Sequence, residues 1–371
     1  MGHTPYILMV AAVLLFGAIL PQKGTQRIWY IALMTVLHTC LCGFRYMLIT
    51  GDLHKYYFMF SDSGAAQWFS AELWAEGRNF GFYYFNKIIY LLSDGDFQAF
   101  LFVIAAIIHI VLGYLIYRYS PAPWFSYLVW NCMSFYIFGF SAIKQALAMA
   151  FIMLAFVGIA EKRLGLYLTM MAIAGSIHMP ALVFLPAYWL CGMKIKPNIV
   201  ILYIILGMAI YVFKNQFVAF IRTFYYEDDE IMIHSGEIGS RMIMILGFTL
   251  FGLFFRGFRD PVFGSLFHIM AVASILQLLA GFDNIFTRLT DYYFQMSVLY
   301  LPMTFFPRRH VSKRVDGLAP VLPFNRRSMA LLAAVIVAFA LWFYWTYNIN
   351  ITIDYEVDNY LNYRSMWDVI K

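Results

Sequence analysis

The sequence predicts an all-α protein, a polytopic bundle of transmembrane helices forming one domain over residues 1–371, and three observations predict it. Apolar residues make up 63% of the chain and charged residues 12%, whereas about a quarter of the residues in a soluble domain are charged. The apolar residues are gathered into segments separated by polar connections. The charges are distributed unevenly between alternate connections, which is typical of a membrane protein with a fixed orientation.

The apolar segments predict about twelve membrane spans. Some are shorter than the roughly 20 residues that cross a bilayer, so tilted or half-helices are expected and the number lies between about ten and thirteen. The first segment has no basic residue before it and no small-residue cleavage site after it, which indicates a permanent helix. The segments are 6–20, 28–44, 97–117, 122–140, 142–160, 164–177, 180–193, 198–216, 241–255, 262–280, 285–306 and 328–347.

The charge distribution predicts which ends of these spans face the cytoplasm. With the spans threaded alternately, one face carries 15 of the 26 Lys and Arg residues but only three of the 20 acidic residues. By the positive-inside rule this face is cytoplasmic. Both termini are therefore expected on the extracytoplasmic side.

Three stretches are expected on the external side: an aromatic-rich loop at about 45–96, a loop at about 217–240 with an acidic run, and a tail at 348–371. Within the first, Trp68–Glu76 reads as a short interfacial helix. The cytoplasmic side has no comparable segment, so chemistry is expected outside, on outward-facing loops.

Composition also argues against several classes of site. The four cysteines fall inside apolar segments, with neither a disulfide framework nor zinc-ligand spacing. The net charge of +6 is mostly cytoplasmic loop charge, which topology explains without nucleic acid. We expect no metal and no cofactor.

Four cations, Arg45, Lys144, Arg241 and Arg288, lie on the acidic external side, each at the edge of an apolar segment. A positive group near lipid is costly to place there, so it suggests a function such as anion binding. Arg45 precedes Asp52 across a glycine turn. The pair fits a phosphate clamp, and a side chain that reaches out to the membrane surface is the alternative.

Lys144 and Gln145 open an apolar segment, where an ammonium group and a helix N-terminus combine at one anion site. A lysine reaching to the surface is again the alternative. His178 lies where two short segments meet. It suits a general base near neutral pH, although a lone membrane histidine is also commonly a hydrogen-bonded structural residue.

Arg288 is the strongest single candidate, because it lies near the start of an apolar segment with Tyr292 one helical turn later on the same face. Asp291, three residues after Arg288, offers the alternative of an ion pair within the helix. Arg241 is a weaker candidate, since an acidic loop precedes it and can neutralise it.

These blocks, in this order, resemble the EpsG family of membrane proteins, grouped with Wzy-type polysaccharide polymerases. The likeness covers about residues 1–300. This chain departs from the family pattern in two places. Gly51 and Asp52 are adjacent instead of separated by one residue. Lys144 replaces the usual arginine, and a lysine holds phosphate without the planar fork of a guanidinium group. The blocks are Arg45-Tyr46…Gly51-Asp52…Tyr56, Glu76…Gly81-Phe82, Lys144-Gln145-Ala146-Leu147-Ala148, Ala174…His178 and Arg288…Tyr292-Tyr293-Phe294.

The resemblance implies a glycosyltransferase that polymerises exopolysaccharide or O-antigen repeat units carried on undecaprenyl diphosphate at the outer leaflet. It also implies a bacterial cytoplasmic (inner) membrane and a GT-C-like arrangement, in the sense of outward-facing catalytic loops. The catalytic residues would be His178, Asp52 and Arg288. The substrate-binding residues would be Arg45, Lys144, Gln145, Arg241, Tyr56, Tyr292 and Tyr293. The partners would be the lipid-linked glycan, membrane lipid and a separate regulator of chain length.

Two other functions remain open at this point. Arg27 and His38 are separated by ten residues, similar to the Arg-x10-His pattern of membrane acyltransferases that modify glycans. A flippase or exporter of lipid-linked sugars would share the lipid contacts, but it is expected to carry charges across the bilayer. Here the charges cluster at one face.

Overall fold

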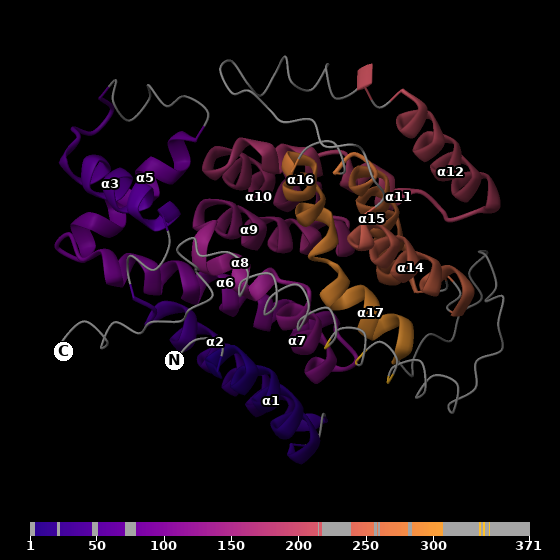
Figure 1. The fold of residues 1–371 in the computed structure, drawn as a ribbon, viewed down its shortest axis with the longest axis horizontal. Helices are drawn as coiled ribbons and strands as arrows, with labels where there is room; N and C mark the ends of the chain where they lie inside the picture. Colours follow the sequence, from indigo (N-terminus) through magenta and orange to yellow (C-terminus); the bar gives the residue numbers. More distant parts are fainter. Residues whose placement is uncertain are drawn as a thin grey trace.

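The computed structural model is built almost entirely of helices (Figure 1). It describes residues 4–20, 23–46, 51–70, 79–213, 215–216, 239–255, 258, 260–280 and 284–306, with the isolated positions 334, 337 and 341. These residues form fifteen α-helices and one 3-10 helix and contain no β-strand. The all-α prediction is therefore confirmed.

Eight predicted spans coincide with one helix each. Two of these helices, α6 and α9, are long and apolar enough to cross a membrane by themselves; α2 is also long but less apolar, and the other five are shorter. The number of crossings therefore stays a prediction. The eight are α1 (Thr4–Ile19), α2 (Gly24–Gly43), α6 (Phe97–Tyr119), α9 (Ile143–Ala160), α10 (Leu164–Ile177), α12 (Pro197–Val212), α14 (Ser240–Phe255) and α15 (Pro261–Gln277).

Three predicted continuous spans are broken, which corrects the sequence-based boundaries. Segment 122–140 divides into α7 (Pro123–Cys132) and α8 (Phe135–Ser141), and Ser134 between them has φ 67°, a left-handed conformation that ends a helix. Segment 180–193 becomes the 3-10 helix η1 (Met179–Phe184) and α11 (Ala187–Gly192). Segment 285–306 divides into α16 (Asn284–Phe294) and α17 (Ser297–Phe305).

The stretch 45–96, expected to be mainly a loop, contains two packed helices, α3 (Gly51–Ala65) and α5 (Phe80–Leu92). The Lys87 ammonium group joins them, because it donates to the carbonyl oxygens of Ser63, Gly64 and Ala66 at 3.5, 3.1 and 2.5 Å. These carbonyls lie at the C-terminus of α3, where a cation is favourable. The sequence missed the pair because aromatic residues and glycines obscure its helical periodicity.

Of the helix expected at 68–76, residues 68–70 form a turn, with Phe69 at φ 60°, and the rest lies outside the described residues. The acidic part of loop 217–240, the last span and the tail 348–371 also lie largely or wholly outside them.

α9 and α10 run antiparallel side by side (Figure 1), and α9 is largely buried within the bundle. A turn of three residues, Glu161 to Arg163, connects them, and Lys162 adopts the left-handed conformation with φ 56°. α6 lies against α9, and α5 packs on α10. His178, just after α10, therefore returns to the end of the bundle at which α9 begins.

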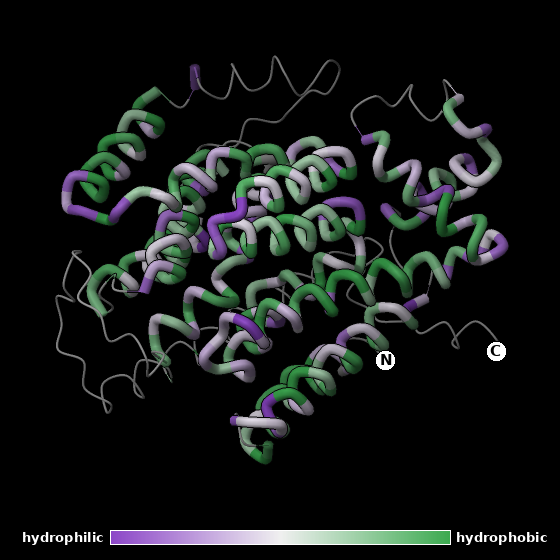
Figure 2. Tube along the Cα trace, turned by 180° about the vertical axis from the view of Figure 1, so that it is seen from behind, coloured by the Kyte–Doolittle hydropathy of each residue, from purple (hydrophilic) through white to green (hydrophobic). Residues whose placement is uncertain are grey.

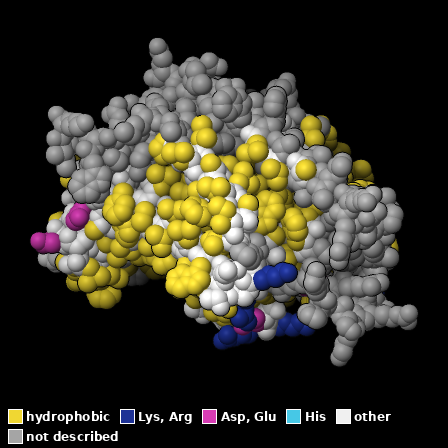
Figure 3. Space-filling model, turned by 90° about the horizontal axis from the view of Figure 1, so that it is seen from below, with side chains coloured by type: hydrophobic (Ala, Val, Ile, Leu, Met, Phe, Trp, Pro, Cys, Tyr) yellow, Lys and Arg dark blue, Asp and Glu magenta, His cyan; other side chains and the backbone are white. Residues whose placement is uncertain are grey.

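Hydropathy along the chain follows this arrangement. Hydrophobic residues occupy most of the helix lengths, and hydrophilic segments lie mainly at helix ends and connections (Figure 2). From below, apolar side chains cover much of the described surface, with Lys and Arg gathered toward one edge (Figure 3). Such a surface suits a lipid environment.

Candidate functional site

The first part of the site is the contact between α3 and the N-terminus of α9. A hydrogen bond joins the Tyr56 phenol group to the Lys144 backbone, and Tyr56 also lies close enough to Asp52 and Arg288 to interact electrostatically. Burial, followed by the charge of Asp52, raises the pKa of Tyr56 to about 12. Tyr56 is therefore a neutral phenol at physiological pH.

His178 forms the second part. It is the C-cap of α10, in an extended conformation with φ −148° and ψ 102°, and the next residue begins η1. Its Nδ1 is hydrogen-bonded to the Tyr292 hydroxyl of α16. Asn79, which the sequence analysis missed, accepts a hydrogen bond from the Met179 backbone N–H at 3.3 Å. Its only sequence signal is a polar residue at the start of α5.

The surroundings of His178 hold its imidazole ring neutral. Burial is the largest influence, and the positive charges of Lys144 and Arg288 add to it; together they lower the pKa of His178 to about 3. Lys144 of α9 and Arg288 of α16 therefore both lie close enough to His178, at the α10–η1 junction, to interact with it electrostatically. We call Tyr56, Lys144, His178 and Arg288 the polar cluster.

Arg288 is exposed on α16. Gln145, which is buried, donates from Nε2 to the Arg288 carbonyl oxygen at 2.9 Å. This bond connects the first turn of α9 to α16 and so determines where Arg288 lies relative to Lys144. Gln145 therefore helps to position Arg288, and its role in substrate binding stays a prediction.

Arg241 on α14 forms an ion pair with Asp291 on α16. The two side chains are only 17% and 9% exposed. Asp291 therefore has its ion pair with a neighbouring helix and not with Arg288 in its own helix, although it lies close enough to Arg288 to interact electrostatically. The pair holds α14 beside the polar cluster.

Replacing Asp291 with asparagine should destabilise the protein strongly. The substitution leaves the Arg241 charge buried without its partner, and breaking a buried pair in this way costs about 3–5 kcal/mol. Thermal unfolding in detergent measures the effect. The double variant Arg241→Gln with Asp291→Asn should recover most of the loss, and a single variant as stable as wild type would contradict a structural role for the pair.

Arg45 does not join the polar cluster. It is fully buried after α2, where its Nη1 donates to Cys42 and its guanidinium carbon lies 5.3 Å from the centre of the Phe140 ring. Its Nε and Nη2 have no hydrogen-bond partner among the described residues. Arg45 also interacts electrostatically with His109 of α6, so it is directed into the bundle.

Tyr293 is also directed away from the polar cluster. Its hydroxyl donates to the Val183 carbonyl at 2.7 Å, and its ring lies 4.8 Å from that of Phe184. These contacts pack α16 on η1. Glu76 lies outside the described residues. The glycine at position 81 is explained by packing. An added Cβ would lie 2.9 Å from the Ser176 carbonyl carbon, so glycine permits the close approach of α5 to α10.

An apolar groove of about 630 Å³ lies between α12, α14 and α15. Met242, Leu246 and Leu250 line its α14 side, and Met242 directly follows Arg241. One end of the groove therefore lies beside the Arg241–Asp291 pair, and the groove continues along the apolar length of the helices.

Arg27 and His38 of the acyltransferase pattern both have structural partners. Arg27 donates to the carbonyls of Ile116, Tyr117 and Ser120 at 3.2, 2.7 and 2.8 Å, which caps the C-terminus of α6. His38 is buried, with Nδ1 bonded to the Met34 carbonyl and Nε2 to Asn131. The pair therefore forms no common site.

Within the described ranges, no three His, Cys, Asp or Glu residues are grouped so that they could hold a metal ion. The cysteines are free thiols. The polar groups that converge at the cluster are cations, a phenol and an imidazole, which suit an anionic ligand rather than a metal.

Comparison with known proteins gives one match. The family model of the EpsG family matches residues 28–365. No curated protein and no solved structure matches the chain. Because the match extends over nearly the whole chain, including every residue of the polar cluster, this protein is a member of the EpsG family.

Proposed function

We propose that this protein is a membrane-embedded polysaccharide polymerase that joins repeat units carried on undecaprenyl diphosphate. The observation that carries the proposal is the polar cluster: Lys144 and Arg288, from two other parts of the fold, both lie within electrostatic reach of His178. Two cations beside a neutral imidazole suit a reaction in which a diphosphate leaves and a hydroxyl loses its proton.

The proposed reaction is a glycosyl transfer between two lipid-linked glycans. A hydroxyl of the acceptor unit attacks the anomeric carbon of the growing chain and forms the new glycosidic bond. The bond from that carbon to the diphosphate oxygen breaks, and the lipid diphosphate leaves with the bonding electrons. The hydroxyl proton passes to His178.

His178 suits the role of general base through one tautomer. If Nδ1–H donates to the Tyr292 oxygen, Nε2 carries the lone pair that accepts the acceptor's proton. Tyr292 then determines both the tautomer and the orientation of the ring. Asp52, on α3 one turn before Tyr56, is a second candidate for receiving the proton or binding a sugar hydroxyl.

Lys144 and Arg288 are proposed to stabilise the charge that develops on the diphosphate. Positive groups held in place before the reaction are worth most where water is excluded. α9 is 18 residues long and its N-terminus has no side-chain cap, so its dipole adds to the positive potential beside Lys144. Tyr56 supplies a neutral hydroxyl at the same place.

The hydrocarbon tail of the lipid is proposed to lie in the groove between α12, α14 and α15. The groove is apolar and begins beside Arg241, close to Arg288. Its size is within the range of about 300–1,000 Å³ for small-molecule sites. A lipid diphosphate whose head lies at the polar cluster therefore has an apolar path for the first part of its tail.

The proposal also includes the cellular setting. The polar cluster belongs to the side that the charge distribution assigns to the outside, so the reaction would occur at the outer leaflet of the bacterial inner membrane, with both termini on that side. Polymer length is proposed to depend on a separate regulatory partner.

The test is polymerisation by the purified protein in liposomes that contain lipid-linked repeat units from its own organism. A ladder of glycan lengths is the expected product. The acyltransferase alternative predicts acyl transfer without lengthening, and the flippase alternative predicts movement of the unit between leaflets with no new glycosidic bond.

A groove variant tests the placement of the tail. Leu250→Trp fills the groove and should weaken use of long polyprenyl carriers at least about tenfold, while units on short, soluble carriers react as with wild type. Leu202→Trp, at an exposed position on α12, is the matched control. Equal loss with both carriers would contradict the tail site while leaving the polymerase proposal intact.

A further inference from the structure

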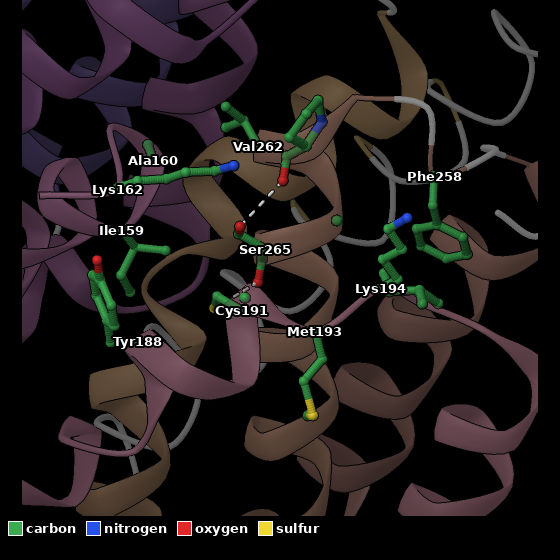
Figure 4. A pocket seen from close by; sticks show the side chains of 14 residues that line it. Ile159, Ala160, Lys162, Tyr188, Cys191, Met193, Lys194, Phe258, Val262 and Ser265 are labelled. Atoms are coloured by element: carbon green, nitrogen blue, oxygen red, sulfur yellow. Dashed lines mark hydrogen bonds between the residues drawn. The ribbon is translucent and has the colours of Figure 1, made fainter. Parts of the chain in front are cut away.

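A second cavity, of about 490 Å³, lies where α9 ends, between the α9–α10 turn, α11 and the start of α15 (Figure 4). α9 has 18 residues, so about 26 Å of helix separates this cavity from Lys144. The cavity is therefore distinct from the polar cluster and lies at the opposite end of the bundle.

Two lysines give the cavity its charge. Lys162 extends from the α9–α10 turn toward the start of α15, and Lys194 follows α11 on another side of the cavity (Figure 4). The left-handed backbone at Lys162, with φ 56°, is unusual for a residue with a side chain. It directs a cation from the end of the hairpin toward the cavity.

The neighbouring acidic groups do not neutralise these lysines. Glu161 forms ion pairs with Arg118 at 2.6 Å and Arg163 at 3.5 Å. Asp260 caps α15 by accepting hydrogen bonds from the N–H groups of Val262 and Phe263 at 2.9 and 3.4 Å. Neither Lys162 nor Lys194 forms an ion pair with a residue in the described ranges.

The rest of the cavity is largely apolar, with Ile195, Phe258 and Val262 among the lining residues. Tyr188 also lines it, and the adjacent Trp189 is 56% exposed. Tyrosine and tryptophan are enriched where membrane and water meet. Two cations above an apolar wall at such a boundary match the head and upper chains of an anionic lipid.

We propose that this cavity binds a phosphate group through Lys162 and Lys194, presented by an anionic phospholipid of the leaflet at this end of the bundle. The phosphodiester lies between the two ammonium groups, and the acyl chains follow the apolar wall. Bound lipid would connect the α9–α10 turn to α11 and α15. The proposal does not depend on polymerase activity.

The test compares the full-length protein with Lys162→Gln/Lys194→Gln and with Lys23→Gln/Lys196→Gln. The control pair removes the same charge from exposed positions outside the cavity. Phosphatidylglycerol, phosphatidylcholine or inorganic phosphate is added in detergent. Thermal unfolding and native mass spectrometry then measure stabilisation and retained lipid.

Phosphatidylglycerol should raise the Tm of wild type and of the control by about 3 °C, with one or more lipids retained, and have no such effect on the cavity variant. Lys194→Glu, a charge reversal at an exposed position, should abolish the effect even if the double variant folds poorly. Equal stabilisation of all variants, or none, would overturn the site. If inorganic phosphate stabilised the protein as much as the lipid does, and through the same lysines, the result would contradict a phospholipid as the ligand.

Discussion

Replacing Arg288 with alanine should reduce polymer formation by about 10²–10³-fold while the protein stays folded. This is the loss typical when one group that stabilises developing negative charge is removed. Arg288 is exposed, so its side chain can be removed without opening the core, and Gln145 bonds its backbone carbonyl and not its guanidinium group. The rate at which the glycan ladder appears in liposomes measures the effect.

Two further variants make the Arg288 test specific. Arg288→Lys should recover part of the activity, because a point charge remains but the planar fork that binds two oxygens is lost. Arg163→Ala removes an exposed arginine at the opposite end of α10 and should leave the rate unchanged. A wild-type rate in Arg288→Ala would show that the polar cluster is not the diphosphate site.

Replacing His178 with glutamine should lower the rate by about 10²–10⁴-fold, the usual contribution of a general base. The proposed base is the neutral ring, and burial, Lys144 and Arg288 lower the pKa of His178 to about 3. As the pH is lowered, protonation of His178 should therefore reduce the kcat/KM of the wild type only near pH 3.

The variant Lys144→Gln tests the direction of this pH effect. Removing one of the cations that lowers the pKa of His178 should raise that pKa, so kcat/KM should begin to fall at a higher pH than in the wild type. Adding Lys144→Gln to His178→Gln should cause no such shift, because the residual activity of His178→Gln has no imidazole at position 178 to titrate. If kcat/KM began to fall at the same pH in Lys144→Gln as in the wild type, the result would contradict His178 as the base.

Several parts of the fold followed from the sequence because they depend on local composition. The apolar segments at 97–117, 142–160 and 164–177 became α6, α9 and α10 within about two residues, since a helix in lipid must satisfy its own backbone. The family assignment drawn from the short blocks is confirmed by the match over residues 28–365.

The breaks were less visible in the sequence. Segment 122–140 is apolar throughout, and hydropathy does not register the left-handed conformation of Ser134. α3 and α5 were read as a loop because their stability depends on each other, through Lys87 and their mutual packing, more than on a clear apolar stripe of their own.

Arg45, Lys144, Arg241 and Arg288 illustrate the same division. Their type and order are read from the sequence, and the charge distribution predicts that they lie on the external side and that some of them hold an anion. Which of them meet was not apparent. Lys144 and Arg288 both interact electrostatically with His178, Arg241 forms an ion pair with Asp291, and Arg45 is buried against Phe140.

Composition and charge placement predicted a helical membrane protein with its chemistry at one face, and the short sequence blocks indicated the EpsG family, which the match over residues 28–365 confirms. Only the tertiary structure decided which residues form the candidate site and which support it. The physical reason is range: hydropathy and helix formation act over a few neighbouring residues, whereas the electrostatic field at His178 is the sum of charges brought by α9 and α16, 34 and 110 positions away along the chain.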